Sequence, residues 1–381
     1  MTNQKSILIL FEPVNQTALI KSLIENVRVK DIQIDAWNAS TWKFVDEISG
    51  NDFNNISSSI RQLVFRIPKI GVLIRRILGY FIMKKIILNY TAIDIHFFTP
   101  TYFKLLDYLI KIEKPYKITI WGSDYFRVSP QRKKRQKKYY QNANIIHICT
   151  KQMKERFLLD FPFASDKICL ARFGISQFDF IDQYRDRDIC LLPIKNSENK
   201  IVITCGYNGS RAQQHEIIIN AINQLQKELK NRLILIFPLT YGATKKYINT
   251  LKNLLFRTEI THYIFSKHLS NEENAQLRVM TDIVVNIQET DALSASLQEH
   301  LYAGNLLIAG SWLPYQIFNE SGIFYLTTSL KELVEILSYC IDNLDHLQEK
   351  LKENHNKINN LSSWKTVSPV WINIYQKLLN Q

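Results

Sequence analysis

The sequence DIVVNIQETDALSASLQEHLYAG (282–304) sets an apolar strand, a turn and a helix in direct succession. The run DIVVNIQ favours a buried strand, and the segment after the turn has the spacing of a helix that ends at Ala303-Gly304. Asp291 stands at the turn, and Glu299 follows it after seven intervening residues, two turns into the helix. A strand that leads directly into a helix is half of a βαβ unit, so this stretch predicts an α/β fold with a parallel sheet.

The turn before this helix carries groups that suit a nucleotide diphosphate. The backbone N–H groups of Ala292, Leu293 and Ser294 would point at an anion from a helix N-terminus. Asp291 would accept hydrogen bonds from sugar hydroxyls, and Glu299 would bind the two vicinal hydroxyls of a ribose. The alternative is an amphipathic surface helix with a serine N-cap and two solvated carboxylates.

Alternating strands and helices continue along the chain in two series. The stretch between them, residues 179–200, is polar and has the composition of a linker. At 381 residues the chain is too long for one compact core and suits two domains. We predict two Rossmann-like domains, residues 1–185 and 200–360, which face a central cleft, and a last segment, 361–381, which crosses back to the first domain. The active site should lie in the cleft at the C-terminal ends of the strands.

Cysteine usage and hydropathy indicate a cytoplasmic protein. The cysteines are odd in number, and their spacing suggests neither a metal site nor a disulfide framework, which favours buried free thiols in a reducing compartment. The N-terminus, MTNQKSILILF, predicts a first strand rather than a signal peptide. No apolar run approaches the ~18 residues that a transmembrane helix needs.

The positive charge of the chain is concentrated in residues 51–140. This quarter has 18 Lys and Arg but only five acidic residues, a surplus that equals the net charge of +13 of the whole chain. Basic residues alternate there with large apolar ones, as in an interfacial helix on anionic lipid. The residues that we assign to membrane and acceptor contact are Arg75, Arg76, Lys84 and Lys85. A solvated charged face and, more weakly, nucleic-acid binding are the alternatives.

Several segments resemble glycosyltransferases of the GT-B fold. The Asp-x7-Glu stretch resembles the Glu-x7-Glu segment of family 4. In CGYNGSRAQQHEIIINAI (205–222), Arg211 is the one cation where family 4 usually has Arg and Lys. This loop more closely resembles family 56, the fucosaminyltransferases, through Gly206, Gly209, Arg211 and His215. The resemblance covers about 205–290 and extends to the N-terminal half only by architecture.

This resemblance implies roles for individual residues. Arg211 would hold the donor diphosphate, Tyr241 would line the nucleotide pocket, and His268 stands where such enzymes hold the base through backbone groups. The donor-binding residues implied are Gly209, Arg211, Tyr241, His268, Leu293, Ser294 and Glu299, with Asp291 on the donor sugar. In the first domain, Asp124 of WGSDYFR is the candidate acceptor-side base, and its alternative is a helix cap.

The function implied is transfer of a sugar from a nucleotide-diphosphate donor to a polyprenyl-diphosphate-linked saccharide in bacterial surface polysaccharide synthesis. Such an enzyme would lie at the inner face of the cell membrane, without a metal or other cofactor and without nucleic acid as a partner. Two alternatives stay open. A nucleotide-sugar epimerase of the same fold would need no membrane surface, and a non-catalytic basic protein would bind a membrane or nucleic acid.

Overall fold

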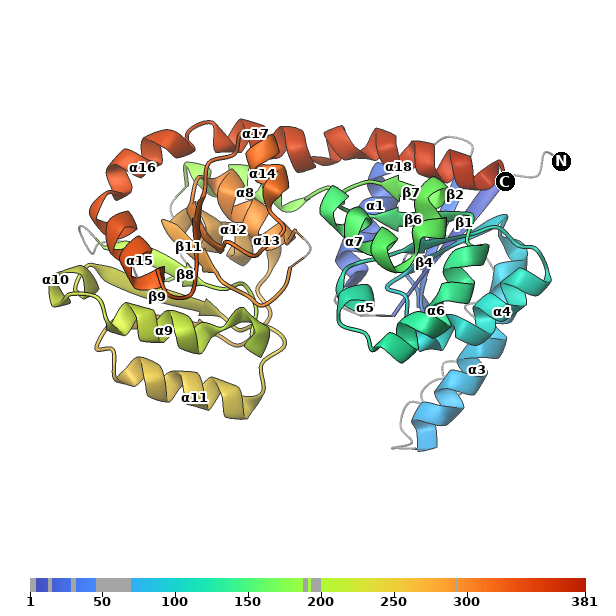
Figure 1. Cartoon of the computed structure of the whole chain (residues 1–381), viewed down its shortest axis with the longest axis horizontal. Helices are drawn as coiled ribbons and strands as arrows, with labels where there is room; N and C mark the ends of the chain where they lie inside the picture. Colours follow the sequence, from blue (N-terminus) through green and yellow to red (C-terminus); the bar gives the residue numbers. More distant parts are fainter. Residues whose placement is uncertain are drawn as a thin grey trace. The chain divides into compact units, whose positions relative to one another are not determined.

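The computed structural model of the chain describes residues 5–12, 16–28, 32–45, 70–187, 191–192, 200–291 and 293–381, except for the side chains of 70–76. The chain forms two compact units. The first combines Met1–Gly174 with Val367–Gln381, and the second spans Ile175–Thr366. Each unit has one predominantly parallel sheet with helices packed against it (Figure 1). Two Rossmann-like units of this kind confirm the predicted α/β fold class.

Within the described residues, the sheet of the first unit has seven strands in the order β3-β2-β1-β4-β5-β6-β7. Neighbouring strands are parallel, apart from the antiparallel pair of β2 and β3. The strands are β1 (Lys5–Phe11), β2 (Ile32–Asn38), β3 (Lys43–Phe44), β4 (Ala92–His96), β5 (Tyr116–Thr119), β6 (Ile145–Ile148) and β7 (Ile168–Leu170). The helices are α1 (Thr17–Asn26), α3 (Ile70–Ile86), α4 (Phe103–Lys111), α5 (Ser123–Phe126), α6 (Pro130–Asn142), α7 (Lys151–Asp160) and α18 (Trp364–Leu379), with short 3₁₀ turns η3 (Ile87–Asn89), η4 (Pro100–Tyr102) and η5 (Pro162–Lys167).

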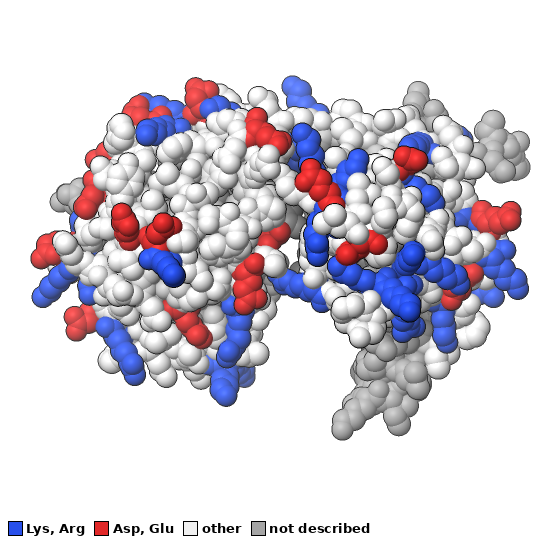
Figure 2. All heavy atoms as spheres, in the orientation of Figure 1, with Lys and Arg blue, Asp and Glu red and all other residues white. Residues whose placement is uncertain are grey.

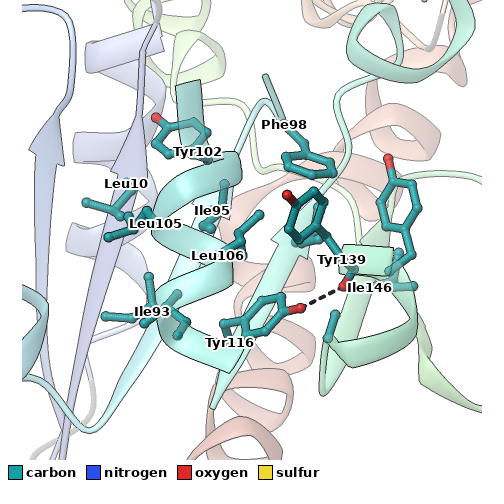
Figure 3. Packing of buried hydrophobic residues seen from close by; sticks show 14 of the residues in the cluster. Leu10, Ile93, Ile95, Phe98, Tyr102, Leu105, Leu106, Tyr116, Tyr139 and Ile146 are labelled. Carbon is teal, nitrogen blue, oxygen red and sulfur yellow. Dashed lines mark hydrogen bonds between the residues drawn. The ribbon is translucent and has the colours of Figure 1, made fainter. Parts of the chain in front are cut away.

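One face of this sheet packs on α4 and α6 through large apolar side chains (Figure 3). Leu10 of β1 and Ile95 of β4 are completely buried in the same cluster as Leu106 of α4. Each such side chain contributes about 1.5–3 kcal/mol through burial. The hydroxyl of Tyr116 donates to the carbonyl oxygen of Tyr139 at 2.7 Å, so this aromatic residue is buried without an unpaired polar group.

The other face of the sheet carries a buried ion pair beneath α18. Nζ of Lys117 lies 2.7 Å from the Asp94 carboxylate, and both side chains are completely buried. Tyr375 of α18 donates its hydroxyl hydrogen to the same carboxylate at 3.0 Å, and the Lys117 ammonium lies 4.7 Å from the ring centroid of Trp371. Burial alone would raise the pKa of Asp94, but His96 and Lys117 hold it below its ordinary value. These contacts fix the C-terminal helix on the first unit.

In the residues that the structure describes, the second unit has six parallel strands in the order β10-β9-β8-β11-β12-β13. They are β8 (Ile201–Cys205), β9 (Leu233–Pro238), β10 (Thr261–Phe265), β11 (Ile283–Asn286), β12 (Leu306–Gly310) and β13 (Leu326–Thr328). The helices are α8 (Gln177–Arg185), α9 (His215–Asn223), α10 (Lys227–Lys230), α11 (Lys245–Phe256), α12 (Asn271–Met280), α13 (Ala295–Ala303), α14 (Gln316–Glu320), α15 (Leu333–Asp342), α16 (Leu344–Leu351) and α17 (Asn354–Ser362), with the 3₁₀ turn η6 (Arg211–Gln213).

The two helices that flank the candidate site, α12 and α13, have well-defined ends. Helix α12 begins at a capping box, in which the Ser270 hydroxyl accepts from the Glu273 N–H and the Glu273 carboxylate accepts from the Ser270 N–H. Helix α13 ends at Gly304, whose φ of 95° lies in the left-handed region that glycine adopts without a steric penalty. The sequence predicts this end of α13 correctly.

The boundary between the units differs from the predicted one. We expected the first domain to reach residue 185, but α8 (177–185) belongs to the second unit. The ring of Phe178 stacks on that of Tyr302 at 3.9 Å, and Asp182 accepts a hydrogen bond from the Tyr302 hydroxyl at 2.7 Å. The chain returns to the first unit at Val367, six residues after the predicted start of the last segment. Much of the predicted linker lies outside the described residues.

Four of the five cysteines lie in the described residues, and all four are free thiols. Cys205 and Cys340 are buried, and burial raises the pKa of Cys340 to about 12. A thiol in such a site stays protonated at neutral pH and behaves as a small apolar side chain. Cys190 lies outside the described residues.

Candidate functional site

The carboxyl ends of the strands in the second unit bring together most of the predicted donor-binding residues. Because the carboxyl ends of parallel strands meet at one edge of a sheet, the loops after β8, β9 and β11 are neighbours there. Tyr241, in the loop after β9, keeps half of its surface exposed. Its partial burial raises its pKa, and the charges of Glu299 and Asp291 raise it further, which places all three in one neighbourhood. Throughout the described residues, no cluster of three His, Cys, Asp or Glu side chains could hold a metal ion.

The loops after β8 and β9 pack backbone against backbone at Gly209. The Gly209 N–H donates to the carbonyl oxygen of Tyr241 at 2.7 Å. A Cβ atom at this position would lie 2.4 Å from Cβ of Ala243, so only glycine fits without a shift of the backbone. We predicted that Gly209 contacts the donor. Its N–H already donates to Tyr241 within the protein, and the residue shapes the loop from which Arg211 extends, so contact with the donor stays a prediction.

The carboxylate of Asp291 is surrounded by hydrogen-bond donors of the protein. It accepts from the Ser294 N–H at 3.1 Å, from the Tyr207 hydroxyl at 3.3 Å and from the Tyr315 hydroxyl. Gln288 extends this network, because its amide donates to the Tyr207 hydroxyl at 3.0 Å. A carboxylate has about four lone-pair sites, so a sugar hydroxyl at Asp291 would have to share or displace one of these partners. Asp291 therefore has a structural task beside its predicted contact with the donor sugar.

The start of α13 is shaped by Asp291 rather than by a serine cap. Ser294 occupies the N-cap position, but its hydroxyl makes no capping hydrogen bond. Leu293 has a φ of 79°, a left-handed conformation that costs a residue with a side chain about 1–2 kcal/mol. The N–H groups of 295–297 have no acceptor one turn earlier in the helix and are the ones available to an anion. Ala292, the first residue of the predicted turn, lies outside the described residues.

Glu299 forms an ion pair inside the second unit. Nη2 and Nε of Arg278 on α12 lie 2.9 and 3.1 Å from Oε2 of Glu299. Nη2 also donates to the Ser296 hydroxyl at 2.8 Å. The Glu299 side chain is 14% exposed and that of Arg278 only 6% exposed. We expected Glu299 to face a ligand without a role in folding, but it also neutralises a buried guanidinium.

The remaining predicted donor residues differ in their surroundings. Arg211 is exposed, and its guanidinium carbon lies 4.9 Å from the ring centroid of Tyr247. Tyr241 is 52% exposed, so its ring is accessible to a ligand. His268 is exposed in the loop after β10. His215, at the start of α9, is completely buried, and burial lowers its pKa to about 4.

Asp124 lies at the carboxyl edge of the sheet in the first unit and is 2% exposed. Its carboxylate accepts hydrogen bonds from the backbone N–H groups of Phe98 at 2.9 Å and of Trp121 and Gly122 at 3.0 Å. Burial raises the pKa of Asp124 to about 6, although these N–H groups favour the ionised form. A general base must reach the proton of its substrate. The contacts therefore favour a role in ordering the loops after β4 and β5, and catalysis by Asp124 stays a prediction.

The basic residues that we assigned to a membrane lie on α3. The side chains of Arg75 and Arg76 are outside the described part of the chain. Lys84 is half-buried, with Nζ 4.3 Å from the ring centroid of Tyr108, and Lys85 is exposed. Within the described residues, no helix combines the length and the apolar character needed to cross a membrane.

Large apolar side chains lie on the same face of α3 as Lys85. Ile77, Phe81 and Leu88, the last in η3, are 47%, 59% and 54% exposed. Their spacing of four, four and three residues along 77, 81, 85 and 88 puts them on one helical stripe with Lys85. Figure 2 shows further Lys and Arg side chains gathered over α6 of the same unit. Those on α6 are Arg132, Lys133, Lys134, Arg135, Lys137 and Lys138.

Four residues of the site were not predicted from the sequence. Tyr207, Tyr315 and Gln288 belong to the Asp291 network, and Arg278 pairs with Glu299. A signal existed for Arg278, because it shares the buried face of α12 with Ala275. A charged residue at such a position must find a partner. No comparable signal marks Tyr315, which lies in a loop after β12 and reaches Asp291 only through the fold.

The fold is that of GT-B glycosyltransferases of known structure. A glycosyltransferase from Rickettsia africae aligns over 100% of both chains, with 14% identity and a TM-score of 0.73. HepE from Anabaena, in complex with UDP and glucose, aligns over 99% of this chain and 100% of its own, with 12% identity and a TM-score of 0.68. Sucrose-phosphate synthase from Thermosynechococcus elongatus aligns over 99% of each chain, with 14% identity and a TM-score of 0.70.

Neither a protein-family profile nor a curated protein sequence matches this chain. At identities of 12–14% the structural similarity establishes the fold alone. It does not transfer the functions of these proteins to this chain. The function of this chain has to be argued from its site.

Proposed function

We propose that this protein is a glycosyltransferase that transfers a sugar from a nucleotide-diphosphate donor to a saccharide carried on polyprenyl diphosphate. Its product would serve bacterial surface polysaccharide synthesis at the inner face of the cell membrane. The observation that carries the proposal is the carboxyl edge of the second unit. Asp291, the start of α13 and Glu299 lie there within a GT-B fold.

This unit offers a set of binding groups for the nucleotide-sugar donor. The N–H groups of 295–297 and the exposed guanidinium of Arg211 would bind the diphosphate. The exposed ring of Tyr241 would contact the base, and Glu299 would bind the ribose. In sugar transfer the nucleoside diphosphate leaves with increased negative charge. Hydrogen-bond donors and cations aimed at the diphosphate therefore lower the activation barrier. The complex of HepE with UDP and glucose is consistent with a donor of this class in a protein of the same fold.

The first unit would meet the acceptor and the membrane. A polyprenyl-diphosphate acceptor keeps its charged group at the level of the lipid headgroups. The exposed apolar stripe of Ile77, Phe81 and Leu88 beside Lys85 suits insertion between headgroups, and the basic residues of α6 suit anionic lipid. A donor site on one unit and a membrane-facing acceptor surface on the other would explain why the surplus of basic over acidic residues lies in residues 51–140 of the first unit.

Ligand-induced stabilisation tests the donor half of this proposal. Thermal unfolding should be followed with UDP, GDP and dTDP sugars, each at millimolar concentration, and with CMP sugars, which carry a single phosphate, as the control. A ligand present at 100 times its Kd stabilises a protein by about 2.7 kcal/mol, which is a clear shift of Tm. Absence of a shift with every nucleotide sugar would contradict the proposal. Conversion of a bound nucleotide sugar without any acceptor would identify an epimerase instead.

A further inference from the structure

Arg278 and Glu299 form an asymmetric pair. Both hydrogen bonds from the guanidinium end on Oε2 of Glu299, at 2.9 Å from Nη2 and 3.1 Å from Nε. Nη2 is shared with the Ser296 hydroxyl at 2.8 Å, one turn earlier on α13. Glu299 thus has one carboxylate oxygen turned toward α12, while its side chain keeps 14% of its surface exposed.

Arg278 is held firmly enough to orient its partner. Its backbone carbonyl oxygen accepts a hydrogen bond from the Asn305 amide at 2.9 Å. Its side chain is 6% exposed, and Nη1 is buried without a hydrogen-bond partner among the described residues. A buried guanidinium with an unpaired nitrogen is costly, so a role besides folding would account for its presence at this position.

We propose that Arg278 is a positioning residue for recognition of the nucleoside sugar ring. It fixes Oε2 of Glu299, and this leaves Oε1 to accept a hydrogen bond from a hydroxyl of the ribose or deoxyribose. This inference rests on the proposed function, because it requires a nucleotide at the start of α13. It changes the predicted contact from a symmetric bidentate carboxylate to one oxygen that is held and one that binds the ligand.

The inference predicts that discrimination between sugar rings depends on Arg278. The probe is whichever of UDP, GDP, CDP, ADP and dTDP binds wild-type protein most tightly, compared with its 2′,3′-dideoxy counterpart by calorimetry. A hydrogen bond to a charged group corresponds to roughly 10- to 150-fold in affinity, so wild-type protein should prefer the hydroxyl-bearing nucleotide by about that factor. Arg278→Met should reduce the preference to within about 3-fold, as should Glu299→Gln. Arg278→Lys should restore part of it.

A purely structural role for Arg278 gives a different result. Loss of packing would weaken both nucleotides equally, and an unchanged preference in Arg278→Met would overturn the inference while the proposed function stands. If Arg278→Met does not fold, Ser296→Ala and the paired change Arg278→Met with Glu299→Met replace it. The first should lower the preference and the second abolish it, and retention of the wild-type preference in the second would also overturn the inference. Wild-type protein that binds none of the five nucleotides would refute the proposed function itself.

Discussion

Lys117 and Asp94 form an ion pair of 2.7 Å whose two side chains are completely buried beneath the C-terminal helix. The same distance separates Lys138 and Asp107 on the surface of the first unit, where the two side chains are 60% and 48% exposed. The two pairs have the same charged groups at the same distance, but only the buried one also contacts Thr119 and Tyr375, so they compare a buried, networked ion pair with an exposed one.

The first prediction follows from that comparison. Asp94→Asn leaves the Lys117 ammonium buried without a counter-charge, which should lower the free energy of unfolding of the first unit by about 3–5 kcal/mol. Asp107→Asn removes an exposed pair and should cost no more than about 1 kcal/mol. Urea unfolding of both variants measures the difference. Similar losses in the two variants would show that Thr119 and the ring of Trp371 are enough to stabilise the buried Lys117 ammonium.

The second prediction concerns stability at Glu299. Glu299→Ala leaves the Arg278 guanidinium buried and unpaired, and we expect it to lower the free energy of unfolding of the second unit by about 3–5 kcal/mol. Glu289→Ala, an exposed glutamate close by in the sequence, is the control and should change it by no more than about 0.5 kcal/mol. Denaturant unfolding monitors both. A Glu299→Ala protein as stable as the control would mean that water reaches Arg278 in solution.

The alternation of strands and helices was predictable because it depends on local periodicity. The end of α13 at Gly304 was also predictable, since a left-handed residue after a helical run is a local signal. The pairing of Arg278 with Glu299 was not, because it depends on how α12 and α13 pack together. The unit boundary was misplaced for the same reason, since α8 is assigned to the second unit by its contacts with Tyr302.

The third prediction separates the two tasks of Asp291. If its main task is to hold the turn before α13, Asp291→Asn should weaken binding of a nucleoside diphosphate and of the matching nucleotide sugar by a similar factor. Loss of a hydrogen bond to a charged acceptor corresponds to about 1.5–3 kcal/mol, or roughly 10- to 150-fold. Calorimetry with both ligands measures this. Weaker binding of the nucleotide sugar alone would assign Asp291 to the donor sugar, as the sequence resemblance implies. Tyr315→Phe, which removes one donor to Asp291, should cause a smaller loss of the same kind.

The fourth prediction uses the pH dependence of stability at Asp124. Burial raises its pKa to about 6 from an ordinary value of 3.8, so the folded state binds this proton more tightly than the unfolded state. The resulting stabilisation is complete below about pH 4 and is lost as the pH rises through about 6, by about 3 kcal/mol in total. Subtraction of the Asp124→Asn stability curve isolates this contribution, and parallel curves for the two proteins would rule it out. If Asp124 is also the general base, Asp124→Asn should lower turnover by roughly 10²–10⁴ in a transfer assay.

The last prediction concerns the exposed stripe on α3. A surface that combines Phe81 with Lys84 and Lys85 should bind vesicles of anionic lipid but not zwitterionic ones, because each basic residue near an anionic surface contributes about 1 kcal/mol. Salt should weaken the binding, since it screens charges beyond a Debye length of about 10 Å at 0.1 M.

Lys84→Glu with Lys85→Glu should abolish most of the binding to anionic vesicles. Lys245→Glu with Lys246→Glu makes the same charge change on exposed residues of α11 in the second unit and should leave it intact. Co-sedimentation of folded protein with each vesicle type measures the effect.

Phe81→Asp should weaken binding even at high salt, because the apolar contact is not screened. Equal recovery of wild-type protein with both lipids at low salt would leave the charge as a solvated face, and the acceptor would then have to be sought in solution.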